Sequence, residues 1–217
     1  LVVPLLAELI AELFGLNRRD IGFGLDIFVI MVISLLFCAS VWVGLEKGVK
    51  RLSNINVYFA FFVLAFVFLV GPTLFIIEMG ISSFGHLFQN FIKMSTWLDP
   101  MRKSDFVESW TIFYWAWWVA LGPYMGIFIA RISKGRTLKQ IILGCLIYGT
   151  LGCTLFFMVF GNYSAYLELN GIVSVLSILN EDGAPMAIVQ VLKSLPLASL
   201  VLIAFTLLCI IFAATSF

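Results

Sequence analysis

The sequence predicts an all-α integral membrane protein. Hydrophobic residues make up 62% of its 217 residues and charged residues only 12%, whereas a soluble domain is about half apolar and about one quarter charged. The apolar residues are gathered into stretches close to the ~20 residues that a helix needs to cross a bilayer. We therefore expect a bundle of membrane-spanning helices, with residues 1–217 in a single transmembrane domain.

Five stretches are long enough to be complete spans, and Leu1–Leu16 is expected to be the end of a preceding one. The complete spans are expected at Leu25–Leu45, Val57–Met79, Trp110–Ala130, Gln140–Gly161 and Leu197–Phe217. No charged segment precedes Leu1, and the last apolar run has no polar exit. We therefore interpret the sequence as a fragment of a longer chain.

The loop charges predict how these spans cross the membrane. Glu46–Arg51 and Arg131–Lys139 are both positive, and an even number of spans separates them, so both are expected on the cytoplasmic side. The mixed-charge loops Gly80–Glu108 and Asn162–Pro196 are expected outside. Because the net charge is only +1 and the basic residues stay in short loops, nucleic-acid binding is not indicated. The expected location is the inner (plasma) membrane, crossed several times.

Two local patterns predict helices outside or at the edge of the spans. In residues 80–94, apolar side chains such as Ile81, Phe84 and Phe88 recur at helical spacing opposite polar ones. This pattern is typical of an amphipathic helix that lies in the membrane interface. Thr137, followed three residues later by Gln140, has the form of a capping box that opens the next span.

The reactive side chains do not form an enzyme site. Every cysteine lies inside an apolar stretch and none forms a C-x-x-C pair, so neither a disulfide framework nor zinc is indicated. The single histidine, His86, has no partner histidine with which to hold a haem. Paired intramembrane carboxylates and a Ser-His-Asp arrangement are also missing from the sequence. We expect no catalysis and no organic cofactor.

The segment Trp110–Thr137 contains the strongest candidate for a binding site. Trp110 falls at the outer membrane edge, where indoles favour the headgroup level, whereas Trp115, Trp117 and Trp118 lie deeper. Tyr114, Trp118, Leu121 and Met125 share one helical face. Gly122-Pro123 is expected to break the helix near the middle of the bilayer. Indoles beside a broken helix could hold a quaternary ammonium group, and they could equally be helix packing.

A resemblance to a known family decides between these interpretations. The runs "WTIFYWAWW", "GP" and "ARISKGRT" resemble the signature of the betaine/carnitine/choline transporter family, and "LSNIN", "FVFLVGPT", "LFQNFIKM" and "ATS" extend the likeness along most of the chain. The resemblance implies about a dozen spans, ten of them in two inverted repeats of the sodium-symporter (LeuT-like) type. Residues 1–217 would run from the end of the fifth span into the tenth, so the helical bundle would be incomplete. It also implies a homotrimer.

The same resemblance implies roles for particular residues. Trp118 would belong to the aromatic box around the trimethylammonium group, Trp117 would lie beside it on the pathway, and Phe212 would line the same cavity. Tyr114 shares the helical face of Trp118 and is included in the expected substrate site. Thr215 and Ser216 would coordinate a sodium ion through their hydroxyl oxygens, which suit a hard cation.

Three positions depart from the family pattern. Leu121 stands where some betaine importers carry a further tryptophan. Met125 matches a methionine that replaces a second sodium ion in sodium-independent exchangers. Those exchangers also carry an arginine just after a "SDVR"-like turn, where this chain reads "SNINV" with Val57, and they lack the serine of the Thr-Ser pair. Two of these exchanger features are therefore missing here.

The sequence thus predicts a secondary transporter that imports betaine, choline or carnitine with sodium, embedded in the lipid bilayer. One alternative is a sodium-independent exchanger of carnitine-type trimethylammonium compounds. Another is a membrane sensor or scaffold that does not transport. An ion channel is disfavoured because no pore-lining ring of carbonyls or charges is seen in the sequence.

Overall fold

The computed structural model describes residues 2–16, 21–43, 50–101 and 103–216, and within these ranges the chain is helical and has no strand. The predicted all-α class is confirmed. The helices are α1 (Val2–Phe14), α3 (Phe23–Val43), α4 (Lys50–Val70), α5 (Thr73–Thr96), α6 (Phe113–Ile132), α7 (Leu138–Phe156), α8 (Asn162–Leu169), α9 (Val175–Glu181), α10 (Ala184–Lys193) and α11 (Ala198–Ser216), with π-helical turns η2 (Val107–Ile112) and η3 (Phe157–Gly161).

Among the described residues, four helices are long and apolar enough to cross a membrane. They cover Arg51–Val70, Val107–Ile132, Leu138–Leu169 and Ala198–Thr215, and Phe23–Ala39 is a shorter apolar helix. Four of the five predicted spans are therefore represented with shifted ends. The fifth, Leu25–Leu45, corresponds to α3, and its last two residues lie outside the described ranges together with most of the basic segment Glu46–Arg51.

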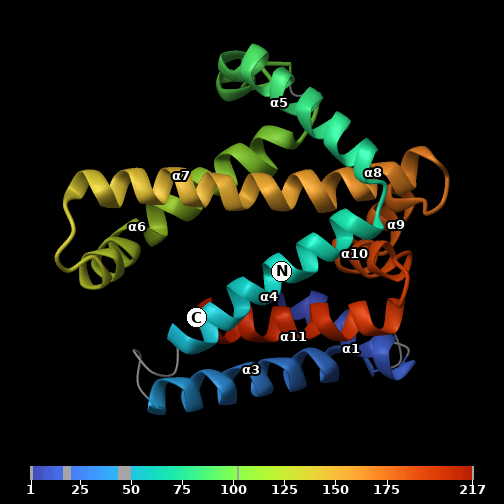
Figure 1. Cartoon of the computed structure of the whole chain (residues 1–217), viewed down its shortest axis with the longest axis horizontal. Coiled ribbons are helices and arrows are strands. Elements are labelled where there is room, and N and C mark those ends of the chain that lie inside the picture. The colour runs from blue at the N-terminus through green and yellow to red at the C-terminus, as the bar shows by residue number, and fades with distance from the viewer. Residues whose placement is uncertain (1, 17–20, 44–49, 102, 217) are drawn as a thin grey trace. The chain divides into compact units, whose positions relative to one another are not determined.

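The chain divides into two compact units, each of which is described by itself. The first is Leu1–Met79 with Phe156–Phe217, and the second is Gly80–Leu155. In the first unit α11 packs against α1, α3 and α4, and α4 and α11 run in opposite directions (Figure 1). The largest fully buried side chains of the chain all belong to this unit: Leu6, Leu9, Val67, Ile76, Val189 and Leu192.

The span predicted at Val57–Met79 is wrong at both ends. The helix α4 starts at Lys50 and ends at Val70, because Pro72 has no N–H with which to continue the helix. Gly71 is required beside it, since a Cβ there would lie 2.7 Å from the carbonyl oxygen of Val67. Residues 73–79 instead open α5, which continues through the predicted amphipathic segment 80–94 to Thr96.

In the second unit, the predicted capping box at the start of α7 is confirmed. The N–H of Gln140 donates to Thr137 Oγ1 at 3.3 Å, and the N–H of Thr137 donates to Gln140 Oε1 at 3.0 Å. Two donors that the helix start would leave unpaired are thereby satisfied. In α5, Nδ1 of His86 lies 3.1 Å from Nδ2 of Asn90. This is a local contact between residues one helical turn apart.

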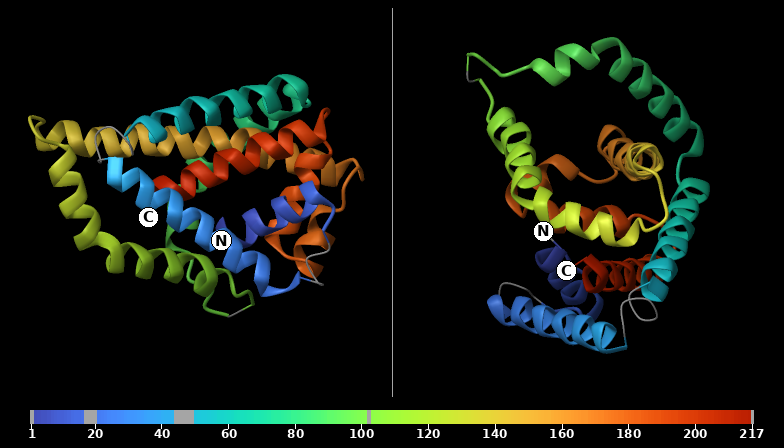
Figure 2. Two further views of the ribbon diagram at one scale, coloured as in Figure 1. Left: turned by 90° about the horizontal axis from the view of Figure 1, so that it is seen from below. Right: turned by 90° about the vertical axis from the view of Figure 1, so that its left-hand side faces the viewer.

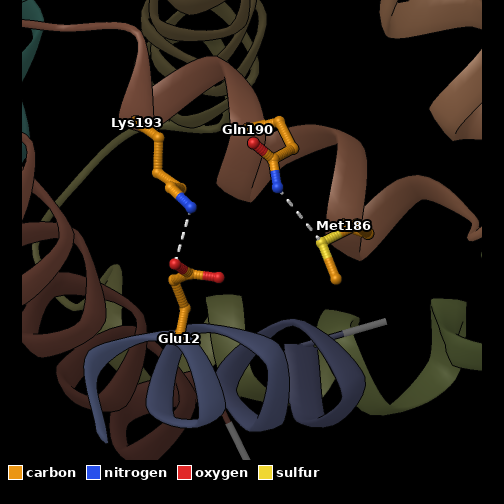
Figure 3. A network of polar contacts seen from close by, with 4 residues as sticks. All are labelled: Glu12, Met186, Gln190 and Lys193. Atoms are coloured by element: carbon orange, nitrogen blue, oxygen red, sulfur yellow. Dashed lines mark hydrogen bonds and ion pairs between the residues drawn. The ribbon is translucent and has the colours of Figure 1, made fainter. Parts of the chain in front are cut away.

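The predicted loop Asn162–Pro196 begins with helix. α7, η3 and α8 form one run of 32 residues, Leu138–Leu169. At ~1.5 Å per residue its length exceeds the ~30 Å of the hydrocarbon core, so part of it must extend beyond the core. The short helices α9 and α10 follow. Lys193 of α10 pairs with Glu12 of α1, with Nζ and Oε1 2.7 Å apart (Figure 3).

Candidate functional site

The aromatic residues of α6 contact one another along the helix. The ring of Phe113 lies 5.6 Å from that of Tyr114 and 5.8 Å from that of Trp117, and Trp110 stacks on Tyr114 at 6.1 Å between centroids. These distances are those of favourable aromatic pairs. Trp118 presents much of its indole to the surroundings, with 59% of the side chain exposed. Phe113 thus contacts both Tyr114 and Trp117, while Trp118 is exposed like most of α6, which has no buried residue.

A shallow apolar hollow lies at the N-terminal end of this run. It measures about 510 Å³ and is lined by Phe106, Trp110, Thr111, Tyr114 and Trp115. Three of the expected substrate residues lie on α6. Tyr114 lines this hollow, whereas Trp117 and Trp118 do not.

The expected break at Gly122-Pro123 is not a break in the helix. α6 is continuous from Phe113 to Ile132 with Pro123 inside it. Proline still cannot donate to the carbonyl of Val119, and its ring crowds that carbonyl, so bending is the expected response. The ribbon of α6 changes direction along its length (Figure 2). Nothing lies within 4 Å of where a Cβ would stand on Gly122 or Gly126.

Two features of the segment between α5 and α6 were not predicted. One is the π-helical turn η2, which directly precedes α6; such single turns often accompany functional sites. The other is the buried Asp99, which has a positive φ of 43° and accepts hydrogen bonds from the N–H (2.8 Å) and Oγ (3.0 Å) of Ser104. The bond from the Ser104 N–H is the main reason that the pKa of Asp99 is lowered.

The end of α11 carries the residues expected to bind sodium. Thr215 Oγ1 is 3.0 Å from the carbonyl oxygen of Ile211 and 3.1 Å from that of Phe212, so the hydroxyl donates one turn back along its own helix. A hydroxyl that donates in this way keeps its lone pairs for a cation. Phe212 is half exposed, and the side chain of Ser216 lies outside the described part of the chain.

The expected site residues belong to different units. Tyr114, Trp117 and Trp118 lie in the second unit, where Phe113 contacts Tyr114 and Trp117, whereas Phe212 and Thr215 lie in the first and share a helix end. Each group is therefore defined within its own unit. A site that combines the two groups stays a prediction.

Comparisons with known proteins give a consistent result. The betaine/carnitine/choline family transporter (BCCT) family matches residues 1–217. A carnitine transporter of Acinetobacter baumannii is 38% identical over 211 residues, which cover 95% of this chain and 37% of that protein. The glycine betaine transporter OpuD of Bacillus subtilis is 38% identical over 78% of this chain and 33% of its own length. An ectoine/hydroxyectoine transporter of Virgibacillus pantothenticus is 37% identical over 86% and 37%. The chain thus spans about a third of the length of these relatives.

Proposed function

Since this chain belongs to the betaine/carnitine/choline transporter family, whose members are transporters and not enzymes, we propose that it takes part in secondary transport of a trimethylammonium compound. The substrate is betaine, choline or carnitine, and it enters the cell together with sodium. The several apolar helices make this a multi-pass membrane protein, and we assign it to the inner (plasma) membrane as a homotrimer.

The observation that carries the proposal is the aromatic run of α6, in which Phe113 contacts Tyr114 and Trp117, and Trp118 follows directly in the chain. A trimethylammonium group has no N–H to donate, so hydrogen bonds cannot hold its charge. The negative faces of indole and phenol rings attract it instead, and the attraction reaches about 2 kcal/mol or more when water is excluded. Trp118, with Trp117, Tyr114 and Phe212, supplies faces of this kind.

Sodium coupling is proposed on the chemistry of the α11 end. Thr215 Oγ1 already donates its hydrogen to backbone carbonyls, so toward an incoming cation it acts as an oxygen ligand. Sodium, like other hard cations, prefers such oxygens. Ser216 would add a second hydroxyl.

The test is uptake into liposomes that contain the purified full-length protein. Labelled glycine betaine, carnitine, choline and ectoine are each offered with an inward sodium gradient, or with potassium in its place. We expect uptake of at least one trimethylammonium compound that needs the sodium gradient. Ectoine, which lacks this group, tests whether the substrate is chosen by its quaternary ammonium.

Trp118→Leu is expected to lower uptake at least tenfold, because about 2 kcal/mol of cation–π attraction is lost. Trp42→Leu is the matched control, since Trp42 lies on α3 with 93% of its side chain exposed and should hardly affect uptake. Equal losses in both variants, in proportion to the amount of protein, would mean that the indoles act only in packing.

Exchange without sodium is the second candidate, and Met125 favours it. Under exchange, unlabelled carnitine inside the liposomes would drive uptake of labelled carnitine in potassium buffer. Uptake at the full rate in potassium buffer would mean that the protein exchanges substrates and does not couple to sodium. The proposed aromatic site would be unaffected by this result.

A further inference from the structure

Asn56 carries a buried amide oxygen without a partner. The residue lies in the candidate span Arg51–Val70, its side chain is 9% exposed, and its Oδ1 has no hydrogen-bond partner among the described residues. On α4 it shares a buried stripe with Val63 and Val67, which follow it by seven and eleven residues. A polar atom in this setting calls for a partner such as an ion or a water molecule.

The helix α4 packs against α11, which carries the expected sodium ligands, and also against η3. The helices α4 and α11 run in opposite directions (Figure 1). Val70 at the end of α4 and Pro196 just before α11 line the same pocket, so the end of α4 lies near the start of α11. Asn56 lies fourteen residues before Val70, and Ile210 fourteen residues after Pro196. Both helices advance ~1.5 Å per residue, so Asn56 lies nearer the C-terminal end of α11 than its start.

We expect the side chains of Asn56 and Thr215 to lean toward each other along the helix axes. Side chains of a helix tilt toward its N-terminus, so Asn56 on α4 leans toward the C-terminal end of α11. Thr215 leans back in the opposite direction, and its hydroxyl reaches the carbonyls of Ile211 and Phe212. We therefore expect the Asn56 amide and the Thr215 hydroxyl to point toward the same part of α11.

One ring contact shows which side of α11 faces η3. The ring of Phe205 meets Phe160 of η3 at 6.1 Å, and η3 also packs against α4. Phe212, which is half exposed, recurs on this face after seven residues, and Thr215 lies about 80° around the helix from Phe205.

We propose that the side-chain carbonyl oxygen of Asn56 is a ligand of the sodium ion, which binds between α4 and α11 with Thr215. The inference rests on the sodium coupling proposed above and adds a residue that neither the sequence pattern nor the comparisons assign. The two side chains are neutral and present oxygens, which suits a hard monovalent cation. Binding of the ion would satisfy the unpaired oxygen of Asn56 and would tie α4 to α11.

Three variants of the full-length protein test this inference. Asn56→Leu removes the oxygen and suits the apolar stripe. Asn56→Asp keeps an oxygen and loses the amide N–H groups. Asn54→Leu is the matched control, because Asn54 lies on the same helix and is exposed. Two quantities are measured: the sodium concentration that gives half-maximal substrate uptake, and the rise in Tm of the purified protein in NaCl relative to KCl at equal ionic strength.

We expect Asn56→Leu to raise the half-saturating sodium concentration about tenfold or more, the loss typical of a hydrogen bond or contact to a charged group, and to abolish the sodium-specific rise in Tm. Asn56→Asp should bind sodium at least as well as the unmodified protein. Asn54→Leu should leave both quantities unchanged.

Each contrary result has its own meaning. If the unmodified protein responds to sodium and Asn56→Leu responds equally, the oxygen of Asn56 holds no ion and the inference fails alone. If Asn56→Asp behaves like Asn56→Leu, the amide N–H groups matter and the ligand role is wrong. If the unmodified protein shows no sodium response in either measurement, sodium coupling and the Asn56 ligand are both overturned.

Discussion

At the scale of single residues, Thr73 supplies a hydrogen bond that Pro72 cannot donate to the last turn of α4. The carbonyl of Phe68 would normally accept a hydrogen bond from residue 72, which as proline has no N–H. Thr73 Oγ1 donates to this carbonyl at 2.7 Å. The sequence "GPT" therefore contains both the end of α4 and the group that satisfies its last turn.

We expect Thr73→Val to destabilise the protein by about 1–3 kcal/mol, because it leaves a part-buried carbonyl unpaired. Thr96→Val is its control: Thr96 makes the same bond to Ile92 at 2.7 Å on an exposed helix end, where water can replace the hydroxyl. The measurement is Tm in detergent. Equal shifts for the two variants would contradict the assigned role of Thr73.

Some residues of the candidate site could be predicted from the sequence, and others could not. Trp117, Trp118 and Thr215 stand in runs of unusual composition and were found in the sequence. Asn56 was not singled out, because one asparagine in an apolar span has no pattern of its own. Its significance depends on burial and on the missing partner of Oδ1, which only the packing of α4 defines.

At the scale of helices, hydrophobic length predicted which elements exist and was less informative about where they end. The capping box at Thr137 was predicted correctly because its two side chains act within one turn. The end of α4 was misplaced because the apolar run continues past Gly71-Pro72. The π-helical turns η2 and η3 were missed, since one extra residue in a turn leaves no mark in composition.

The bend of α6 leads to a prediction about Pro123. Pro123→Ala would supply the N–H that the Val119 carbonyl lacks and remove the ring clash, a gain of up to about 3 kcal/mol. We expect a higher Tm together with slower uptake, because a straightened α6 would shift the aromatic rings on one side of the bend relative to the other. Initial uptake rate and Tm are measured together.

Pro185→Ala is the control for this prediction. Pro185 lies in the first turn of α10, where an N–H has no helical partner in any case, so neither quantity should change much. A Pro123→Ala protein that transports at the normal rate would exclude a role for the bend in transport.

At the scale of the whole molecule, the alternation of loop charges predicts which loops face the cytoplasm. A basic cluster lies at the end of α6, in the turn that follows and at the start of α7: Arg131, Lys134, Arg136 and Lys139. The segment between α8 and α9 has no cluster of this kind. Positive loops are retained on the cytoplasmic side, and the helix Leu138–Leu169 is long enough to carry the chain to the other side.

Cysteine labelling in intact cells tests this topology. In a protein whose native cysteines are replaced by alanine, Ser174→Cys should react with a membrane-impermeant thiol reagent, since Ser174 is exposed in the turn before α9. Ser164 is a poorer choice, because its Oγ is part-buried and donates to the Gly161 carbonyl at 2.8 Å. Ser133→Cys, at the end of α6, should react only after the cells are opened. Labelling of Ser133→Cys in intact cells, with Ser174→Cys protected, would contradict the predicted orientation and exchange the cytoplasmic and outer loops.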